Sequence, residues 1–429
     1  MKKLYYCFFL HALFLAAPAQ EAVRDFVRKQ AVRVDHIDIR QDNMADLEAL
    51  GAAIGDVRIV ALGEQMHGDG TSFEAKGRIV RYLHEKKGFN VLVFESDFFG
   101  LTYGFSDVPK NRDSINAFLY KNLLGLWSWC HSASTFLYQY IPQTYRTESP
   151  LIIAGMDCQL QTPHSFNGIQ GKMKTLFSKL VEGDAWDVDT VIRSIPAIYF
   201  AGQKRDPQGA EQGLRALNRL IESGGLTGLN GEELNLLYNL RASFRSILPF
   251  LRGEKEGATS HLYRDQQMFD NLMWLIKERF PGQKIMVWAH NAHIGKLPPG
   301  ANREQLMMGN YLGDASINPF KYYALGITSY SATSVWTNGT IGPFKAQEPA
   351  RNGFERWINR DWPFAFVDWT PWNRGKDARQ AFSMKGSMQY SQHRNFVYPW
   401  NQVFDGVFFI RNIEGCRTVS EQDMRAIPD

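Results

Sequence analysis

Two pairs of side chains in this sequence have the types and spacing needed for acid–base chemistry. Glu64 and His67 stand three residues apart after a short apolar run, and His290 and His293 repeat that spacing far downstream. A neutral histidine is a good general base for water near pH 7. A carboxylate within hydrogen-bond reach fixes the tautomer of the histidine and stabilises the imidazolium that forms. Other histidines can donate to a developing oxyanion, so this set could hydrolyse an ester without a covalent intermediate.

Each of these side chains follows a stretch with the pattern of a buried strand. Residues 57–62, 90–94, 151–155 and 284–289 are short and almost wholly apolar, as expected for strands covered on both faces. The carboxyl ends of parallel strands lie at one edge of a sheet, where open α/β sheets place their ligands. We therefore expect the side chains at these four ends to converge in one site: Glu64, His67, Glu95, Asp157, His290 and His293.

The order of these runs predicts an α/β fold with a central, mostly parallel sheet flanked by helices. A helical pattern over residues 72–87, ended by Gly88, joins the first two strands and implies a right-handed crossover. From about residue 166 to 280 the patterns are helical alone, which predicts an all-helical insertion beside the active-site cleft. Further strands are expected at residues 321–329, 364–368 and 406–410.

We accordingly divide the chain into four parts. They are a signal peptide (1–19), a first part of the α/β core (20–165), a helical insertion or cap (166–282) and a second part of the core with aromatic-rich loops (283–429). The signal peptide is predicted from Lys2 and Lys3, the apolar run that follows them, and the small-residue sequence Ala17-Pro-Ala19. We expect a mature chain that starts near Gln20, is periplasmic or secreted, and has no stable membrane insertion.

Charge and cysteine content narrow the possible partners. The sequence has 48 basic and 44 acidic side chains, a near balance that does not indicate a nucleic acid or an anionic membrane as partner. After removal of the signal peptide, Cys130, Cys158 and Cys416 remain, so at most one disulfide can form. A buried apolar cysteine is the favoured interpretation for each of them. The oligomeric state stays open.

Several competing chemistries lack their motifs. The sequence has no Gly-x-Ser-x-Gly nucleophile elbow, no phosphate-binding loop and no dinucleotide fingerprint. Two alternatives to a metal-free hydrolase remain open. Glu64, His67, His290 and His293 are also ligand types for a divalent metal such as zinc or manganese, as in a metal-dependent hydrolase or peptidase. A protein without catalytic activity could instead hold a haem-like or hydrophobic ligand in the same cleft.

Several segments of the chain resemble the erythromycin esterase family. They are Gly63-Glu64-x-x-His67-Gly68, Gly88-Phe89 leading to Phe94-Glu95, Tyr263-Arg264-Asp265, Trp288-Ala289-His290-Asn291-Ala292-His293, and Phe404-Asp405-Gly406. The resemblance spans about residues 50–410. It implies a central sheet with a helical portion beside the cleft, and a hydrolase that opens the lactone ring of macrolide antibiotics. The metal requirement of the family is not uniform, and no cofactor is assigned here.

The resemblance also implies roles for individual residues. His67 would be the base that activates water, with Glu64 beside it, and Glu95, His290 and His293 would complete the catalytic pocket. Lys76 stands where macrolide-cleaving members carry an arginine. The lysine keeps the positive charge but loses the bidentate fork of a guanidinium. The expected substrate is a small-molecule ester or lactone, and the side chains assigned to binding it are Lys76, Arg264, Trp127 and Asp157. The sequence thus predicts an exported esterase of the erythromycin esterase type.

Overall fold

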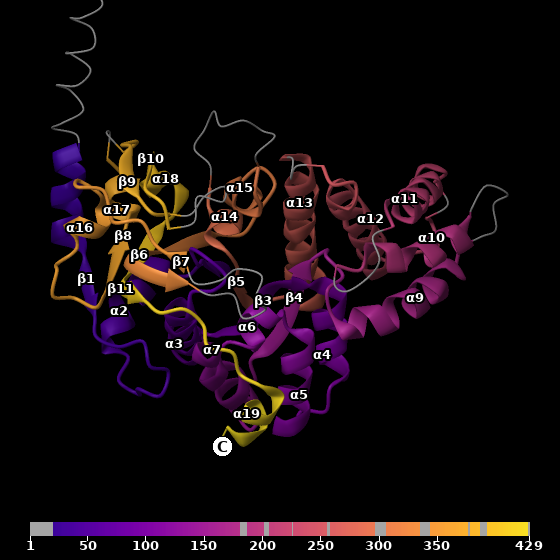
Figure 1. The fold of residues 1–429 in the computed structure, drawn as a ribbon, viewed down its shortest axis with the longest axis horizontal. Coiled ribbons are helices and arrows are strands. Elements are labelled where there is room, and N and C mark those ends of the chain that lie inside the picture. The colour runs from indigo at the N-terminus through magenta and orange to yellow at the C-terminus, as the bar shows by residue number, and fades with distance from the viewer. Residues whose placement is uncertain are drawn as a thin grey trace, which may run out of the picture.

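The protein is described by a computed structural model that covers residues 20–180, 187–200, 206–224, 226–254, 258–296, 306–334, 344–375, 378–386 and 393–427. The predicted signal peptide, residues 1–19, lies outside the described residues. A large sheet occupies the centre of the molecule, and helices cover both of its faces (Figure 1). The predicted fold class, a central sheet flanked by helices, is confirmed.

The sheet is parallel through its middle and antiparallel at one side. Its strands lie in the order β1 (Val32–Val34), β8 (Phe364–Asp368), β11 (Gly406–Ile413), β6 (Tyr322–Ser334), β2 (Ile59–Leu62), β5 (Lys284–Trp288), β3 (Phe89–Asp97) and β4 (Ile152–Asp157). All neighbours from β11 to β4 are parallel, whereas β8 pairs antiparallel with β11 and with β1. β7 (Phe344–Lys345) pairs antiparallel with β6, and β9 (Phe382–Met384) pairs with β10 (Phe396–Tyr398) in a separate ribbon.

The central strands are apolar on both faces because each face supports its own core. In β2, Ile59 and Ala61 enter one hydrophobic cluster, and Val60 and Leu62 enter the other. One core is covered by η1 (Ala45–Leu47), α2 (Glu48–Ile54), α3 (Gly70–Lys87), α5 (Arg112–Asn122), α6 (Gly125–Ser128), α7 (His131–Thr135), η3 (Phe136–Tyr140), α8 (Ile141–Thr144) and α19 (Glu421–Ala426). As predicted, α3 ends at Gly88, which takes a left-handed conformation with φ 72°.

The opposite core is covered mainly by the helical region that follows β4. It contains α9 (Pro163–Phe177), α10 (Val188–Ser194), η4 (Ile195–Ile198), α11 (Pro207–Glu222), α12 (Gly231–Leu251), α13 (Ala258–Trp274) and η5 (Leu275–Arg279). In Figure 1 these helices lie to one side of the sheet, with α13 nearest to it. The remaining helices are η2 (Phe98–Tyr103), α4 (Gly104–Asp107), α14 (Asn291–Ile294), α15 (Met308–Gly313), α16 (Phe354–Trp357), α17 (Thr370–Asn373) and α18 (Trp400–Val403), together with a helix over residues 20–30 that precedes β1. None of the helices within the described residues is long and apolar enough to cross a membrane.

The structure corrects the interpretation of the cysteines. Cys130 and Cys416 form a disulfide across 286 residues of sequence, and only Cys158 is a free, buried thiol. The expectation of a separate buried thiol was therefore wrong for two of the three. The pairing depends on the path of the chain after β11, which returns to the helices around residue 130, and residue spacing carries no information about that path.

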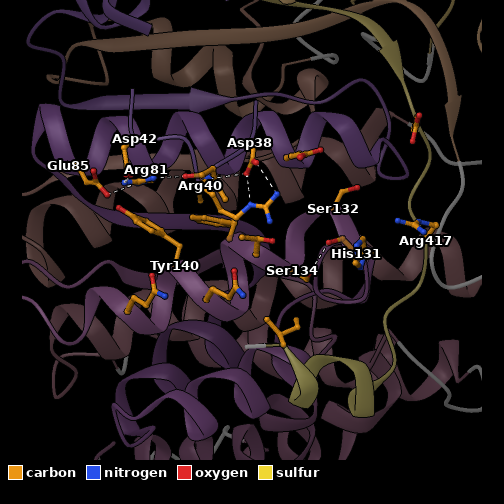
Figure 2. Close-up of a pocket in the computed structure, with 18 residues that line it drawn as sticks. Asp38, Arg40, Asp42, Arg81, Glu85, His131, Ser132, Ser134, Tyr140 and Arg417 are labelled. Atoms are coloured by element: carbon orange, nitrogen blue, oxygen red, sulfur yellow. Dashed lines mark hydrogen bonds and ion pairs between the residues drawn. The ribbon is translucent and has the colours of Figure 1, made fainter. Parts of the chain in front are cut away.

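A cavity lies on the side of the sheet covered by α3, apart from the predicted catalytic side chains. It has a volume of about 940 Å³ and is bordered by the segment around Asp38, by α3, by residues 131–143 and by the end of the chain (Figure 2). Its lining is strongly charged, and Arg40 and Arg81 form ion pairs with neighbouring acidic side chains there. None of the predicted catalytic residues lines it.

A close contact of two chain segments fixes the end of β2. A Cβ atom on Gly63 would lie 1.9 Å from the Oδ1 atom of Asn291. Asn291 cannot move away easily, because its amide nitrogen donates to the carbonyls of Ile327 (2.7 Å) and Gly386 (2.9 Å), and its backbone nitrogen donates to the carbonyl of Glu64 (2.9 Å). The turn that carries Glu64 and His67 therefore needs glycine at its first position.

We predict that Gly63→Ala lowers the free energy of unfolding by about 1–3 kcal/mol, as expected when an extra methyl group is forced into a packed site. The matched control is Gly171→Ala in α9, where an added Cβ meets no atom within 4 Å. This control should stabilise the protein by about 0.5–1 kcal/mol, because alanine is the better helix former. Chemical denaturation of both variants measures the difference, and equal stabilities would contradict the close contact.

Candidate active site

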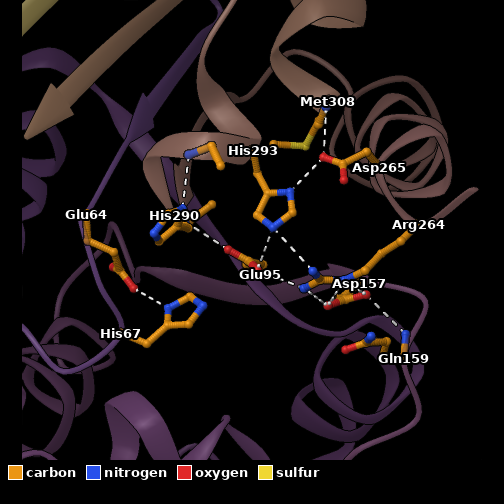
Figure 3. A network of polar contacts seen from close by, with 12 residues as sticks. Glu64, His67, Glu95, Asp157, Gln159, Arg264, Asp265, His290, His293 and Met308 are labelled. Atoms are coloured by element: carbon orange, nitrogen blue, oxygen red, sulfur yellow. Dashed lines mark hydrogen bonds and ion pairs between the residues drawn. The ribbon is translucent and has the colours of Figure 1, made fainter. Parts of the chain in front are cut away.

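The structure brings the five predicted catalytic side chains together at one edge of the sheet (Figure 3). Their strands, β2, β5, β3 and β4, are direct neighbours in that order. Glu64 and His67 follow β2, His290 and His293 follow β5, and Glu95 lies near the end of β3. Asp157 is the last residue of β4 and joins the same network through Arg264 of α13.

The carboxylate of Glu64 is fully buried and accepts three hydrogen bonds. Its Oε1 accepts from His67 Nδ1 at 2.8 Å and from Trp127 Nε1 at 2.9 Å, and its Oε2 accepts from Lys76 Nζ at 2.6 Å. Burial by itself would raise the pKa of Glu64, but the charge of Lys76 and the hydrogen bond to His67 hold that pKa below its ordinary value. Glu64 is therefore an anion that is kept in place from three directions.

Lys76 and Trp127 act on Glu64 and are not exposed to a cleft. Both side chains are fully buried, and Lys76 Nζ also donates to the carbonyl of Ala289 at 3.3 Å and lies 4.3 Å from the centre of the Trp288 ring. Burial lowers the pKa of Lys76 to about 8, although the charge of Glu64 opposes this shift. Both residues were predicted to bind substrate, and the structure places them behind the carboxylate instead, where they would position it.

His67 is partly exposed, with 19% of its side chain accessible. Its ring lies between those of His290 and Trp127, with centroids at 5.3 and 5.8 Å. Because Nδ1 donates to the Glu64 carboxylate, the tautomer that this pair stabilises carries its lone pair on Nε2. That nitrogen is the one suited to accept a proton from water.

His290 connects the two halves of the network. Its backbone nitrogen donates to Glu95 Oε2 at 2.9 Å, its Nε2 lies 2.9 Å from the carbonyl of Gln65, and its Nδ1 accepts from the backbone nitrogen of Ala292 at 3.1 Å. Burial lowers the pKa of His290 to about 3, so the ring is neutral at physiological pH. With both ring nitrogens bonded to backbone groups, His290 fixes the turn after β2 rather than exchanging protons.

Arg264 reaches from α13 to two carboxylates of the sheet. Its Nε and Nη2 contact Asp157 in a bidentate arrangement, with the shortest distance 2.6 Å, and Nη2 also donates to Glu95 Oε1 at 2.7 Å. Burial would lower the pKa of Arg264, but the charges of Asp157 and Glu95 raise it well above its ordinary value. The guanidinium is therefore permanently charged, and 14% of its side chain is accessible.

His293 is the second cation of the site. Its Nδ1 lies 2.7 Å from Asp265 Oδ1, and its Nε2 lies 3.2 Å from Glu95 Oε1. Burial would lower the pKa of His293, but the charges of Asp265 and Glu95 raise it to about 10. His293 Nε2 also lies 3.2 Å from Arg264 Nη1, and both side chains contact Glu95 Oε1. His293 and Arg264 together hold the pKa of Glu95 well below its usual range, although burial would raise it.

Asp265 and a second buried network were missed from the sequence. Asp265 stands in the Tyr263-Arg264-Asp265 segment, one residue after Arg264, and that position was the only available signal. The other network begins at Asp69, two residues after His67. The Asp69 carboxylate accepts hydrogen bonds from Met66 N (3.1 Å), Ser334 Oγ (2.6 Å) and His393 Nε2 (2.9 Å). It ties the catalytic turn to β6 and to the chain beyond β9, a contact that no spacing in the sequence indicates.

The arrangement of these side chains also tests whether they are placed to bind a divalent metal ion. Among the residues that the structure describes, no three His, Cys, Asp or Glu side chains are arranged to hold a metal ion. In its protonated form His293 has no lone pair to give to a metal, and both ring nitrogens of His290 face backbone groups. The described geometry thus uses these side chains as charge partners and positioning groups.

Comparison with known proteins identifies relatives along most of the chain. Residues 84–413 match the sequence profile of the erythromycin esterase family. The chain is 23% identical over 411 residues to YbfO of Bacillus subtilis (strain 168), with 88% of each chain covered. That protein is named as a hydrolase. It is 26% identical over 376 residues to the type II erythromycin esterase of Escherichia coli, covering 76% of this chain and 83% of that protein. A mutant of the erythromycin esterase EreC, solved in its open conformation, has the same fold, with a TM-score of 0.61, 15% identity and 88% and 96% of the two chains covered.

The raised pKa of His293 predicts how its contribution to stability depends on pH. Because the pKa is about 10 in the folded protein and 6.5 in the absence of partners, the contribution is complete below pH 6.5 and is lost as pH rises toward 10. The difference in melting temperature between the wild-type protein and His293→Gln should therefore be largest near pH 6 and shrink steadily toward pH 10. A difference that stays constant over this range would show that His293 is not held as an imidazolium.

Proposed function

The chain belongs to the erythromycin esterase family, and we propose that it is a hydrolase that cleaves a carboxylic ester or macrolactone with water activated by His67. One observation carries this proposal. The partly exposed imidazole of His67 is hydrogen-bonded through Nδ1 to a fully buried, ionised carboxylate that Lys76 and Trp127 hold in place. A histidine oriented in this way is a general base, and its positioning does not depend on a substrate.

The proposed reaction needs two proton transfers by His67. As water attacks the ester carbonyl carbon, Nε2 takes one proton from it, and Glu64 stabilises the resulting imidazolium. When the tetrahedral intermediate collapses, the carbon–oxygen bond of the ester breaks and the imidazolium returns the proton to the leaving alkoxide. A lactone gives a single ring-opened hydroxy acid, and an acyclic ester gives an acid and an alcohol.

The oxyanion of that intermediate needs a nearby positive charge. Arg264 and His293 lie beyond Glu95 as seen from His67 (Figure 3), and 14% and 9% of their side chains are accessible. Both are cationic at neutral pH and both are already held by carboxylates, so they would require little reorganisation during the reaction. We assign them the role of stabilising the oxyanion, with Asp157 and Asp265 as the residues that orient them.

The substrate class follows from the family and from one relative. The Escherichia coli protein is named as an erythromycin esterase, which supports a macrolide or a similar lactone as a substrate of this chain and a role in the response to antibiotics. Lys76 meets Glu64 at a single oxygen, so the lysine at this position supplies the charge that the carboxylate needs without a bidentate fork.

We also propose that the protein is exported to the periplasm or secreted. The features of a signal peptide at the start of the chain support this location, and so does the disulfide between Cys130 and Cys416, because disulfides persist in oxidising compartments. Mass spectrometry of the protein recovered from outside the cytoplasm should find a chain that starts near Gln20. A chain that retains Met1 and stays in the cytoplasm would contradict export.

We predict that His67→Gln lowers kcat for ester or macrolide hydrolysis about 10²–10⁴-fold, the usual contribution of a general base. The amide of glutamine can still donate to Glu64, so the melting temperature should change little. The assay follows addition of one water to a macrolide and to simple aryl esters by mass. His36→Gln, which alters an exposed histidine, is the control and should keep full activity.

Two results would contradict this assignment. Unchanged hydrolysis of every cleaved ester by His67→Gln would show that another group is the base. Complete loss of wild-type activity on chelation, with recovery on addition of zinc or manganese, would show that a metal activates the water.

A further inference from the structure

Residues 414–419, which follow β11 and contain Cys416, form a segment that we call the C-terminal strap. Figure 1 shows it passing α7 on its way from β11 to α19. Its backbone hydrogen bonds place it beside the turn that carries His67 and beside the segment that carries Trp127. These two segments supply two of the three hydrogen bonds that hold the Glu64 carboxylate. The strap is therefore placed to influence the geometry of the proposed base.

On one side the strap pairs with the catalytic turn. The backbone nitrogen of Cys416 donates to the carbonyl of Gly68 at 3.0 Å, one residue after His67. Thr71 binds Glu414 twice, with its backbone nitrogen donating to the Glu414 carbonyl at 3.3 Å and its Oγ1 accepting from the Glu414 nitrogen at 2.8 Å. Asp69 and Gly415 form an antiparallel bridge between these contacts. Residues 414–416 of the strap thus hold the chain from Gly68 to Thr71.

On its other side the strap pairs with the segment that follows Trp127. The backbone nitrogen of His131 donates to the carbonyl of Arg417, and the nitrogen of Val419 donates to the carbonyl of Trp129, both at 2.8 Å. Cys130 forms an antiparallel bridge with Thr418, and its own nitrogen donates to the carbonyl of Trp127 at 3.1 Å. The position of the Trp127 indole is therefore coupled to the strap through one short run of backbone hydrogen bonds.

The Cys130–Cys416 disulfide lies at the junction of these two sets of contacts. It is the covalent link between the strap and the Trp127 segment, and its sulfurs are well covered, with Cys130 inaccessible and 6% of Cys416 exposed. Breaking the bond removes the covalent link between the strap and residue 130, while the backbone nitrogen of Cys416 is hydrogen-bonded to Gly68 in the turn that carries His67.

We propose that this disulfide is a positioning element for the Glu64–His67 pair, so that full hydrolytic activity requires the oxidised protein. The inference rests on the proposed function of His67. Reduction by a dithiol transfers two electrons and two protons, which gives two thiols on the chain and converts the dithiol to its cyclic disulfide. The reduced protein keeps its fold through the two cores, but the turn after β2 and the Trp127 indole lose their common anchor. An exported chain would then become fully active only after oxidation.

A small reductant has a route to the strap. The cavity of about 940 Å³ is lined on its strap side by His131, Ser132, Glu414 and Arg417, which flank the two cysteines in sequence (Figure 2). The strap is therefore bordered by solvent, and dithiothreitol can approach without unfolding of the sheet. Cys158 is buried against Ser246 of α12, with its sulfur 3.8 Å from the Ser246 hydroxyl, and serves as an internal reference in a thiol count.

The test compares the oxidised and reduced full-length mature protein on the same ester substrate. Reduction is verified by a mass gain of two hydrogens and by thiol titration, and the melting temperature must stay above the assay temperature. We expect kcat to fall about tenfold to a hundredfold, the cost of a small misplacement of a catalytic group, while KM changes much less. Re-oxidation should restore kcat. The double variant with Cys130→Ser and Cys416→Ser should show the same low kcat and no response to dithiothreitol.

A second variant loosens the strap without touching the disulfide. Thr71→Val removes the acceptor for Glu414 N but keeps the shape of the side chain, so kcat should fall by a smaller factor in the same direction. Arg425→Ala is the matched control, because this exposed side chain of α19 forms an ion pair with Glu421 one turn away on the same helix, and its loss should leave kcat unchanged. Thr71→Val also keeps the inference testable in case the double cysteine variant does not fold.

A readout that does not need activity separates this inference from the proposed function. In protein labelled with ¹⁵N at its indoles, the Trp127 Nε1–H signal reports the hydrogen bond to Glu64, and reduction should shift it and speed its exchange with solvent. A folded, reduced protein with unchanged kcat and an unchanged Trp127 signal would overturn the inference. If the oxidised protein hydrolyses no ester while the Trp127 signal still responds to reduction, the proposed function fails and the positioning role of the disulfide stands.

Discussion

The site depends on the burial of one ionised carboxylate. Removing an isolated carboxylate from water costs several kcal/mol even after the protein relaxes, so Glu64 is stable as an anion only with strong partners close by. Lys76, Trp127 and His67 supply them at 2.6–2.9 Å. They come from α3, from α6 and from the turn after β2, so these three elements must pack closely around the two carboxylate oxygens of Glu64. Much of the architecture on this face of the sheet serves that requirement.

The same principle organises the other half of the site. Arg264 and His293 are cations enclosed by Glu95, Asp157 and Asp265, and each of these buried charges has at least one partner of opposite sign. Since α13 of the helical region supplies Arg264 and Asp265, the site is incomplete without that region. Through its contacts with Glu95 and with the backbone of Gln65, His290 joins the two halves into one network.

The sequence predicts the scaffold of the site better than its interior. The apolar runs before Glu64, Glu95, Asp157 and His290 became four neighbouring parallel strands, because a strand covered on both faces leaves a strong local pattern. The roles of buried polar side chains depend on contacts between distant segments and leave no such pattern. One signal was present nevertheless: Lys76 lies three residues after Phe73 and four before Val80, on the apolar side of its helix, which indicates a buried lysine with a carboxylate partner.

The disulfide and the network around Asp69 were hidden for the same reason. The Asp69 network joins the turn after β2 to His393, and the disulfide joins residue 130 to Cys416 of the strap, which is hydrogen-bonded to that turn. No local periodicity encodes those pairings. They show that the catalytic turn, although it directly follows a buried strand, is also held from outside the sheet. Its geometry therefore reflects the whole path of the chain.

The central claim is that Glu64 orients His67 as a base, and the tautomer of His67 tests it most directly. Nitrogen-15 NMR of the neutral ring in histidine-labelled, oxidised protein distinguishes a proton on Nδ1 from a proton on Nε2. The account predicts the Nδ1–H form in the wild-type protein, with the lone pair on Nε2, and a loss of this preference in Glu64→Gln. A wild-type ring that carries its proton on Nε2 would contradict the account.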